Sequence, residues 1–242
     1  ITAANVTIKN SKFVGSNLEV DSGSLTITDS EADFGADKDG QGFTGGNITA
    51  KRLNFYGGHR QAWCDHCTIE DSYFHDQNIT QDHTAHSSAM RLENNSTYRH
   101  NTIWCNAPDY PEGGGCSADL TGYPDFGPIH DNTIDKNFLL ATTSGGYCTY
   151  GGWNPGKPYN DDPLNSINIH FTNNVVQRGT QSNDIKDWQE PLTNKDRYTC
   201  GFWGPTTSYN SSRPGFIFTG NMWDDGLLWE NNQDSLYYPF HE

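Results

Sequence analysis

Ile69-Glu70-Asp71-Ser72-Tyr73-Phe74 is one copy of a short phrase that recurs eight times along this 242-residue chain. The phrase places an apolar residue, two spacers, a Ser or Asn, one spacer and a second apolar residue. Successive copies are about 20 residues apart at first, then about 30 and finally more than about 40. Such spacing is typical of a β-solenoid with insertions on its later coils. Leu53 replaces the polar residue in the third copy. The copies are Ile8/Ser11/Phe13, Ile27/Ser30/Ala32, Ala50/Leu53/Phe55, Ile69/Ser72/Phe74, Tyr98/Asn101/Ile103, Ile129/Asn132/Ile134, Phe171/Asn174/Val176 and Phe218/Asn221/Trp223.

A second phrase, with a small residue at its centre, follows the first in the middle of the chain. Its copies are Ser88-Ala89-Met90, Ser117-Ala118-Asp119, Tyr147-Cys148-Thr149 and Thr199-Cys200-Gly201. Residues between the phrases are rich in Gly, Asn, Asp and Ser, which suit tight corners, and no window has a sustained helical period. We therefore expect one all-β domain over residues 1–242, a right-handed parallel β-helix of about eight coils with long loop insertions on the later coils; the handedness follows from strand twist.

The two phrases also predict which side chains point inward. The Ser or Asn of the first phrase should face inward and bind turn backbone. In the second phrase the small residues should form an inward column, which leaves their neighbours to face outward as one wall of a groove. The predicted inward column is Ala89, Ala118, Cys148 and Cys200, and the predicted outward residues are Ser88, Met90, Asp119 and Thr149.

Composition restricts the class of partner. Hydrophobic residues make up 33% of the chain, which suits the thin core of a solenoid. The formal net charge is −15 and there is no run of Lys or Arg, so we expect neither nucleic acid nor membrane insertion. An anionic polysaccharide would need a local basic cluster or a bound Ca²⁺ ion. No stretch resembles a membrane span or signal peptide, so the residues look like a mature or trimmed form.

The six cysteines indicate an oxidising compartment and a pairing. Cys148 and Cys200 occupy equivalent positions in the second phrase, at a separation that a disulfide can bridge. Cys105 and Cys116 flank a loop rich in Pro and Gly, which leaves Cys64 to pair with Cys67. The alternative is a zinc site in Cys64-Asp65-His66-Cys67, although no second CxxC or HxxxH completes it. Sequons at Asn5, Asn47, Asn78, Asn95 and Asn210 fit a secreted glycoprotein.

Residues 59–100 hold six of the nine histidines and the richest chemistry. A groove made by successive coils could bring together His59, His83, His86, Arg91 and Asp119. The run Asp82-His83-Thr84-Ala85-His86 has three readings: acid–base catalysis, a divalent metal site, or a polar turn. Arg91 either points inward beside a carboxylate or sits at the strand end and reaches the groove or Glu93.

Aromatic and basic residues concentrate in the later insertions. Rings stack on the apolar faces of sugars, and loops on a rigid scaffold are a usual place for such sites. The competing interpretation is that the rings plug the long loops against the scaffold. The candidate substrate-binding residues are Tyr150, Trp153, Lys157, Arg197 and Trp203.

The segment Ala62-Trp63-Cys64-Asp65-His66-Cys67-Thr68-Ile69 resembles the Trp-x-Asp-His-Cys-Thr segment of the pectate lyase superfamily. Asn168-Ile169-His170-Phe171-Thr172-Asn173-Asn174-Val175-Val176 is similar to the segment that precedes the catalytic arginine in those enzymes. The resemblance implies a secreted β-helix that acts on polysaccharide, commonly by β-elimination with an Arg or Lys base and Ca²⁺. The chain departs from the pattern after Arg178, where Gly179-Thr180-Gln181-Ser182-Asn183-Asp184 replaces Arg-x-Pro-x-x-Arg. The closely spaced carboxylates of glycoside hydrolases with this fold are also missing.

These observations favour a secreted polysaccharide lyase that cleaves a uronic-acid-containing glycan, with a histidine or Arg91 as base. Ca²⁺ is the candidate cofactor, with Asp65 and Asp82 as candidate ligands. A non-catalytic carbohydrate-binding protein, adhesin or assembly subunit is the alternative. A glycoside hydrolase is a further alternative, with Asp119 paired to Asp65 or Asp82. Self-association through the solenoid ends is also expected, unless the tail Leu236–Glu242 covers one end.

Overall fold

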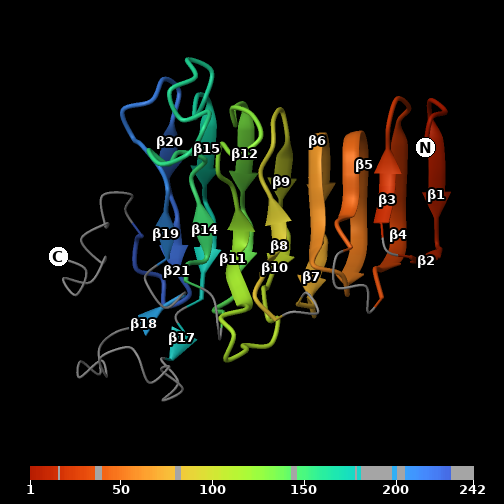
Figure 1. Ribbon diagram of the computed structural model, residues 1–242, viewed down its shortest axis with the longest axis horizontal. Helices are drawn as coiled ribbons and strands as arrows, with labels where there is room; N and C mark the ends of the chain where they lie inside the picture. Colours follow the sequence, from red (N-terminus) through yellow and green to blue (C-terminus); the bar gives the residue numbers. More distant parts are fainter. Residues whose placement is uncertain are drawn as a thin grey trace.

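The computed structural model describes residues 1–15, 17–35, 40–79, 83–142, 146–177, 179–180, 198–200 and 205–229. Every regular element in these residues is a β-strand, so the part that is described contains no helix able to cross a membrane. Figure 1 shows the strands side by side, from the red N-terminal strands to the blue C-terminal ones. The tail Leu236–Glu242, which we expected to cover one end, lies outside the described residues.

The main sheet has 19 strands, which pair in parallel in three series. The first series is β1 (Val6–Lys9), β4 (Leu25–Asp33), β5 (Gly42–Tyr56), β6 (Arg60–Glu70), β9 (Thr97–Arg99), β12 (Asn132–Asp135), β15 (Ile169–Thr172) and β20 (Ile217–Thr219). The second is β2 (Lys12–Val14), β4, β5, β7 (Tyr73–His75), β10 (Thr102–Ile103), β13 (Phe138–Leu139), β16 (Val175–Val176) and β21 (Met222–Trp223).

The third series is β3 (Asn17–Val20), β5, β6, β8 (His86–Arg91), β11 (Gly115–Thr121), β14 (Thr149–Tyr150) and β19 (Thr206–Thr207). A separate antiparallel pair joins β17 (Gly179–Thr180) to β18 (Tyr198–Thr199). Strand β5 belongs to all three series, so the parallel sheet is curled. The prediction of an all-β parallel fold is confirmed, and the curled sheet is consistent with a β-solenoid.

The first phrase sets the register of the sheet. Ile27 pairs with Ala50, and Ala32 pairs with Phe55, as the repeat predicts. One predicted copy is wrong: Tyr98 pairs with Ile134 rather than with Ile129. The true copy is therefore Ile134/Asn137/Leu139. The sequence misleads here because Asn132, the first residue of β12, is also buried and sits in a similar apolar setting five positions earlier.

Buried asparagines form a ladder along the stack. Asn137 Oδ1 accepts from the backbone N–H of Asn101 at 3.0 Å, and Asn137 Nδ2 donates to the carbonyl of Tyr98 at 2.9 Å. Asn174 accepts from Asn137 in the same way at 2.9 Å, and Asn221 accepts from Asn174 at 3.0 Å. Each amide satisfies backbone groups of the turn beside it, so the polar residue of the phrase is structural, as predicted.

The corner residues next to these ladders have a left-handed backbone conformation. Asp71 has φ of 52° and His100 has φ of 55°, directly before Ser72 and Asn101. His66 has φ of 52° at the other corner of the same coil. His83 has φ of 58° as well, so three of the six histidines in the 59–100 stretch have this left-handed conformation, which a polar residue tolerates. Their density in sequence is partly a consequence of the repeat.

The third series contradicts the predicted column of small residues. A register shift between Cys116 and Ala118 places Ala118 opposite Ser88 rather than opposite Ala89. Ser88, Met90, Asp119 and Thr149 were expected to face outward, yet all four are 0% exposed. A second apolar cluster, formed by Ile79, Cys105, Ala107 and Cys116, adds cover outside the main core. The groove wall predicted from this column is therefore absent.

The three predicted disulfides are confirmed: Cys64–Cys67, Cys105–Cys116 and Cys148–Cys200. The reason given for the last pair is wrong, because Thr206, and not a residue beside Cys200, pairs with Thr149. The disulfide at Cys64–Cys67 consumes the thiols that the alternative zinc site would need.

Candidate functional site

Two arginines and two aromatic rings form a compact surface cluster. Trp63 on β6 lies opposite Arg91 on β8 in the strand register. The Arg91 guanidinium is 5.2 Å from the Trp63 ring centre and 5.4 Å from that of Phe126. The Arg60 guanidinium is 5.6 Å from the Trp63 ring, and Phe126 is 69% exposed. We call Arg60, Trp63, Arg91 and Phe126 the arginine–tryptophan patch.

The two guanidinium groups differ in how well they are paired. Arg91 is 5% exposed and donates from Nη2 to Asp125 at 3.0 Å and to the carbonyl of Tyr123 at 3.2 Å. Among the described residues, Arg60 donates only from Nη1, to Gln41 at 3.2 Å, and the buried Nε of each arginine has no hydrogen-bond partner. Burial, together with the nearby positive charge of Arg91, lowers the pKa of Arg60 to about 10. Arg60 is therefore the less satisfied cation of the patch.

Carboxylates flank the patch and have opposite pKa shifts. Burial raises the pKa of Glu93, although Trp63 Nε1 donates to it and Arg91 is near. The pKa of Asp125 is lowered: its partial burial acts the other way, but hydrogen bonds from Lys157 and Arg91 outweigh it. Glu93 Oε1 is 3.9 Å from Arg91 Nε, so both carboxylates face the same guanidinium.

Aromatic contacts extend the patch toward the later coils. Lys157 Nζ is 2.9 Å from Asp125 and 4.4 Å from the centre of the Tyr123 ring. The Tyr123 ring is 4.7 Å from that of Tyr150, whose hydroxyl is 2.9 Å from Ser117 Oγ. Burial raises the pKa of Tyr150, so this residue stays a neutral phenol.

The structure brings together three of the predicted site residues, Arg91, Tyr150 and Lys157, through Asp125 and Tyr123. Sequence reasoning did not assign Arg60, Trp63, Phe126, Glu93 and Asp125 to a site. The register that pairs β6 with β8 would have placed Arg60 and Trp63 near Arg91. The repeat pattern did not give that register. Asp125 and Phe126 lie in a turn after β11, where no repeat fixes their position.

His59 is 5% exposed and lies beneath the loop that carries Asn78. Ser87 Oγ donates to the carbonyl of Asn78 at 2.5 Å and is 3.1 Å from His59 Nδ1. Because the one hydroxyl hydrogen of Ser87 goes to Asn78, His59 donates its Nδ1–H to Ser87. Burial, and then the charge of Arg60, lower the pKa of His59 to about 4, so its imidazole is neutral above that pH.

His83 and His86 make their contacts with residues 110–113 rather than with the patch. The His83 ring stacks on Tyr110 with 3.9 Å between ring centres, and its Nδ1 is 3.9 Å from Glu112. His86 Nε2 is 2.9 Å from the carbonyl of Gly113. These contacts match the polar-turn reading of the segment, and a catalytic role for either histidine stays a prediction.

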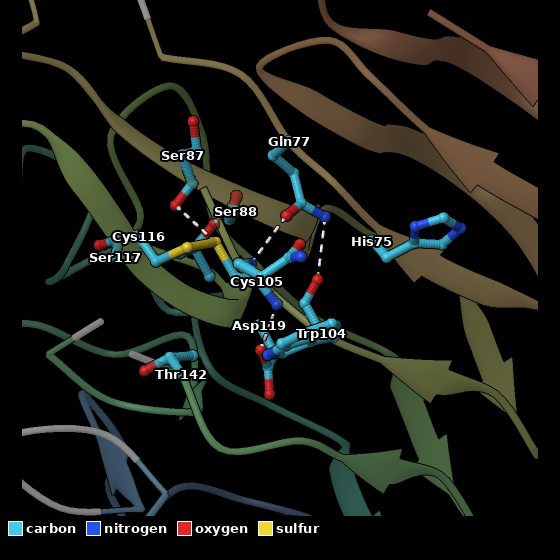
Figure 2. Close-up of a disulfide and its surroundings, with 12 residues drawn as sticks. His75, Gln77, Ser87, Ser88, Trp104, Cys105, Cys116, Ser117, Asp119 and Thr142 are labelled. Atoms are coloured by element: carbon cyan, nitrogen blue, oxygen red, sulfur yellow. Dashed lines mark hydrogen bonds between the residues drawn. A yellow bond between two sulfur atoms is a disulfide. The ribbon is translucent and has the colours of Figure 1, made fainter. Parts of the chain in front are cut away.

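Asp119 is 0% exposed, although it was expected to face a groove. Figure 2 shows its carboxylate below Cys105, whose backbone N–H donates to Oδ1 at 2.6 Å. Its Oδ2 has no hydrogen-bond partner. Burial raises the pKa of Asp119 well above its usual value, which the hydrogen bond from Cys105 only partly opposes. In this position Asp119 has no access to a polysaccharide.

The remaining predicted residues divide into two groups. Trp153 is half-buried, and its backbone N–H donates to the carbonyl of Ser208 at 2.7 Å. Asp65 lies 3.0 Å from its neighbour His66. The second group, Asp82, Arg197 and Trp203, lies outside the described residues.

One group of potential metal ligands is found within the described part of the chain: Asp119, Cys148 and Cys200. Two of its three donors are sulfur atoms, whereas Ca²⁺ takes oxygen ligands. This group therefore does not suit Ca²⁺, and a Ca²⁺ site at Asp65 and Asp82 stays a prediction, since Asp82 lies outside the described residues.

A depression runs over the corners between the first and second strand series, away from the arginine–tryptophan patch. Its volume is about 1010 Å³, and Lys12, Asp29, Arg52, Asp71 and His100 contribute to its lining. These charges are paired with one another: Arg52 is 2.5 Å from Asp29, and His100 is 2.7 Å from Asp71. The arginine–tryptophan patch, with two unpartnered guanidinium nitrogens and the exposed Phe126 ring, is the better candidate for binding.

The chain matches no family model, no curated protein and no solved structure.

Proposed function

We propose that this chain is a secreted carbohydrate-active protein, built as a right-handed parallel β-helix of about eight coils, that binds uronic-acid-containing polysaccharide at the arginine–tryptophan patch and cleaves it by β-elimination. One observation carries the proposal. The Arg60 guanidinium, whose Nε has no hydrogen-bond partner, lies over the ring of Trp63, and that ring contacts the exposed ring of Phe126.

This combination suits an acidic sugar. A guanidinium can bind a carboxylate through two hydrogen bonds, and aromatic faces pack against the apolar face of a sugar ring. The patch also provides the local positive charge that a chain with net charge −15 needs in order to bind a polyanion. The segment Ala62–Ile69, which resembles the pectate lyase superfamily, supplies Trp63 to the patch and so supports the proposal.

The proposed reaction is elimination across C4 and C5 of the uronate. The base removes the proton on C5, the C4–O bond breaks, and the leaving sugar oxygen takes up a proton. Arg60 is the better base, since its pKa is lowered to about 10 and no carboxylate of the described residues forms an ion pair with it. Arg91 lies beside it and supplies positive charge that stabilises the carboxylate-centred enolate.

A second candidate reaction is glycoside hydrolysis by Glu93 and Asp125. Their opposite pKa shifts favour it, because a general acid needs a raised pKa and its partner carboxylate must stay ionised. Arg91 contacts both groups. The earlier pairings through Asp119 are not proposed again, since that carboxylate is buried.

The test is a panel of polyuronates and neutral glycans, incubated with Ca²⁺ or with EDTA and read by unsaturated-uronate absorbance and by new reducing ends. Absorbance together with reducing ends supports the lyase, and we expect Arg60→Met to abolish both signals. Arg52→Met is the matched control, since Arg52 is paired with Asp29 and lies in the separate depression between the first and second strand series. Reducing ends without absorbance, lost in Glu93→Gln, identify the hydrolase instead.

Silence across the panel leaves the non-catalytic alternative, a carbohydrate-binding, adhesin or assembly protein. Affinity electrophoresis in polyuronate gels then tests the binding site alone. We expect Phe126→Ala to weaken retention and Phe126→Tyr to keep it, because the exposed ring contributes contact area and little to the fold. Equal retention of wild type and Phe126→Ala would contradict a binding role for the patch.

A further inference from the structure

The Cys148–Cys200 disulfide has a buried carboxylate beside it. The Sγ atoms of both cysteines and a carboxylate oxygen of Asp119 all lie within 4.8 Å of one another. All three residues are 0% exposed. The three come from separate parts of the chain, on β11, directly before β14, and directly after β18. The disulfide and Asp119 are therefore held together by the fold and not by local sequence.

The hydrogen bonds of Asp119 leave one oxygen free to bind something else. Oδ1 accepts from the backbone N–H of Cys105 at 2.6 Å, which fixes the carboxylate in place (Figure 2). Oδ2 is buried and has no partner. An unsatisfied buried oxygen is unfavourable, and a native protein usually retains one only where another group or ion can satisfy it.

A fourth donor lies at the same point. The carbonyl oxygen of Leu140 is 3.6 Å from Cys148 Sγ and 3.5 Å from Cys200 Sγ. The set therefore contains two sulfurs and two oxygens, which is a donor set that tetrahedral Zn²⁺ accepts. At Zn–S distances of about 2.3 Å, two thiolates on one ion lie about 3.8 Å apart, so the sulfurs must separate but the backbone need not. The Cα atoms are 5.5 Å apart.

We propose that reduction of Cys148–Cys200 converts this cluster into a Zn²⁺ site formed by Cys148, Cys200 and Asp119. A dithiol reductant supplies two electrons and two protons to the sulfurs and becomes a disulfide itself. Zn²⁺ then displaces the thiol protons to solvent. The ion replaces the covalent link between the segments that carry the two cysteines, and it pairs with the otherwise unsatisfied carboxylate of Asp119.

The test is site-resolved alkylation of the full chain. The protein is reduced with a dithiol, the reductant is removed without oxygen, and Zn²⁺ is added or withheld before treatment with N-ethylmaleimide. Peptide mass spectrometry then gives the alkylation rate of each cysteine. We expect Zn²⁺ to protect Cys148 and Cys200, EDTA to reverse this, and Asp119→Asn to lose it.

Cys64 and Cys67 are the internal control, since any Zn²⁺ effect on them should be the same in Asp119→Asn as in wild type. Protection limited to Cys64 and Cys67, or full protection of Cys148 and Cys200 in Asp119→Asn, overturns the proposal. Denaturant unfolding of the reduced chain is the second measurement, because an ion bound only to the native state raises stability. A reduced chain whose unfolding midpoint does not change with Zn²⁺ also overturns it.

Discussion

Arg60 links the proposed chemistry to pH at the scale of one residue. Its pKa is about 10, because burial and the Arg91 charge disfavour the protonated guanidinium. If neutral Arg60 is the base, its active fraction grows about tenfold per pH unit up to that value. We therefore expect the elimination rate to rise steadily between neutral pH and about 10, measured as initial rates of absorbance change. A maximum in the acidic range would instead indicate Glu93 and Asp125.

His59 gives a prediction about stability. Its pKa is about 4 in the folded chain against 6.5 when unfolded, so between these values the unfolded state binds the extra proton. Stability from neutral His59 is present above pH 6.5 and is lost as the pH falls toward 4, by about 2 to 3 kcal/mol in total. Comparing urea unfolding of wild type and His59→Gln across this range isolates the effect, because other groups titrate in both.

The expected result is a free energy of unfolding that falls more steeply with acidification in wild type than in His59→Gln. Parallel curves for the two proteins would mean that the pKa of His59 is the same in the folded and unfolded states. This outcome would also remove the argument that the Ser87–His59 pair is a neutral structural contact.

At the scale of the element, the asparagine ladder satisfies the buried backbone groups of successive turns. Asn137 accepts from Asn101 and donates to the Tyr98 carbonyl, with no exposure to water. Asn137→Ala should destabilise the fold by about 2 to 4 kcal/mol, since it leaves buried backbone groups without partners. Asn17→Ala, at an exposed position on the edge strand β3, should change stability by less than about 0.5 kcal/mol.

Denaturant melts of the two variants check this prediction. A difference of less than about 0.5 kcal/mol between them would show that water or a neighbouring side chain replaces the lost amide. Asn137→Ser keeps one acceptor and should fall between the two.

The repeat made the parallel strands and their inward polar residues predictable, because both follow from spacing alone. Two features of the fold could not be predicted, and the reason is clear for each. Asn132 and Asn137 both lie in apolar settings and both are buried, so spacing could not decide which belonged to the ladder. The irregularity between Cys116 and Ala118 shifts the third strand series, and no residue type marks it in advance.

The candidate site was less predictable than the fold for the same reason. Arg91, Tyr150 and Lys157 could be proposed from composition, but the contacts that join them run through Tyr123 and Asp125 in an irregular turn. Asp119 was predicted to be exposed, but a shift of one residue in strand register moves a side chain to the opposite face of the sheet. The repeat predicts how the strands pair. It does not predict the loop residues that complete the arginine–tryptophan patch.

At the scale of the whole molecule, the disulfides should differ in what they contribute. Cys148 and Cys200 are 52 residues apart, while Cys64 and Cys67 are 3 apart. The loop-entropy relation gives about 4 kcal/mol for the long link and about 1.6 kcal/mol for the short one. We therefore expect the Cys148→Ser/Cys200→Ser variant to melt below the Cys64→Ser/Cys67→Ser variant, measured by calorimetry in the absence of added metal. The reverse order would place the main constraint in the earlier coils.

The long link also determines how the molecule responds to a break in its chain. A protease that cuts any single peptide bond between Cys148 and Cys200 leaves both fragments joined through sulfur. Strands β19, β20 and β21 would remain attached to the body of the protein, and a non-reducing gel would show a single band. The Cys148–Cys200 disulfide therefore keeps the last strands attached even after a cut in this insertion-rich part of the chain.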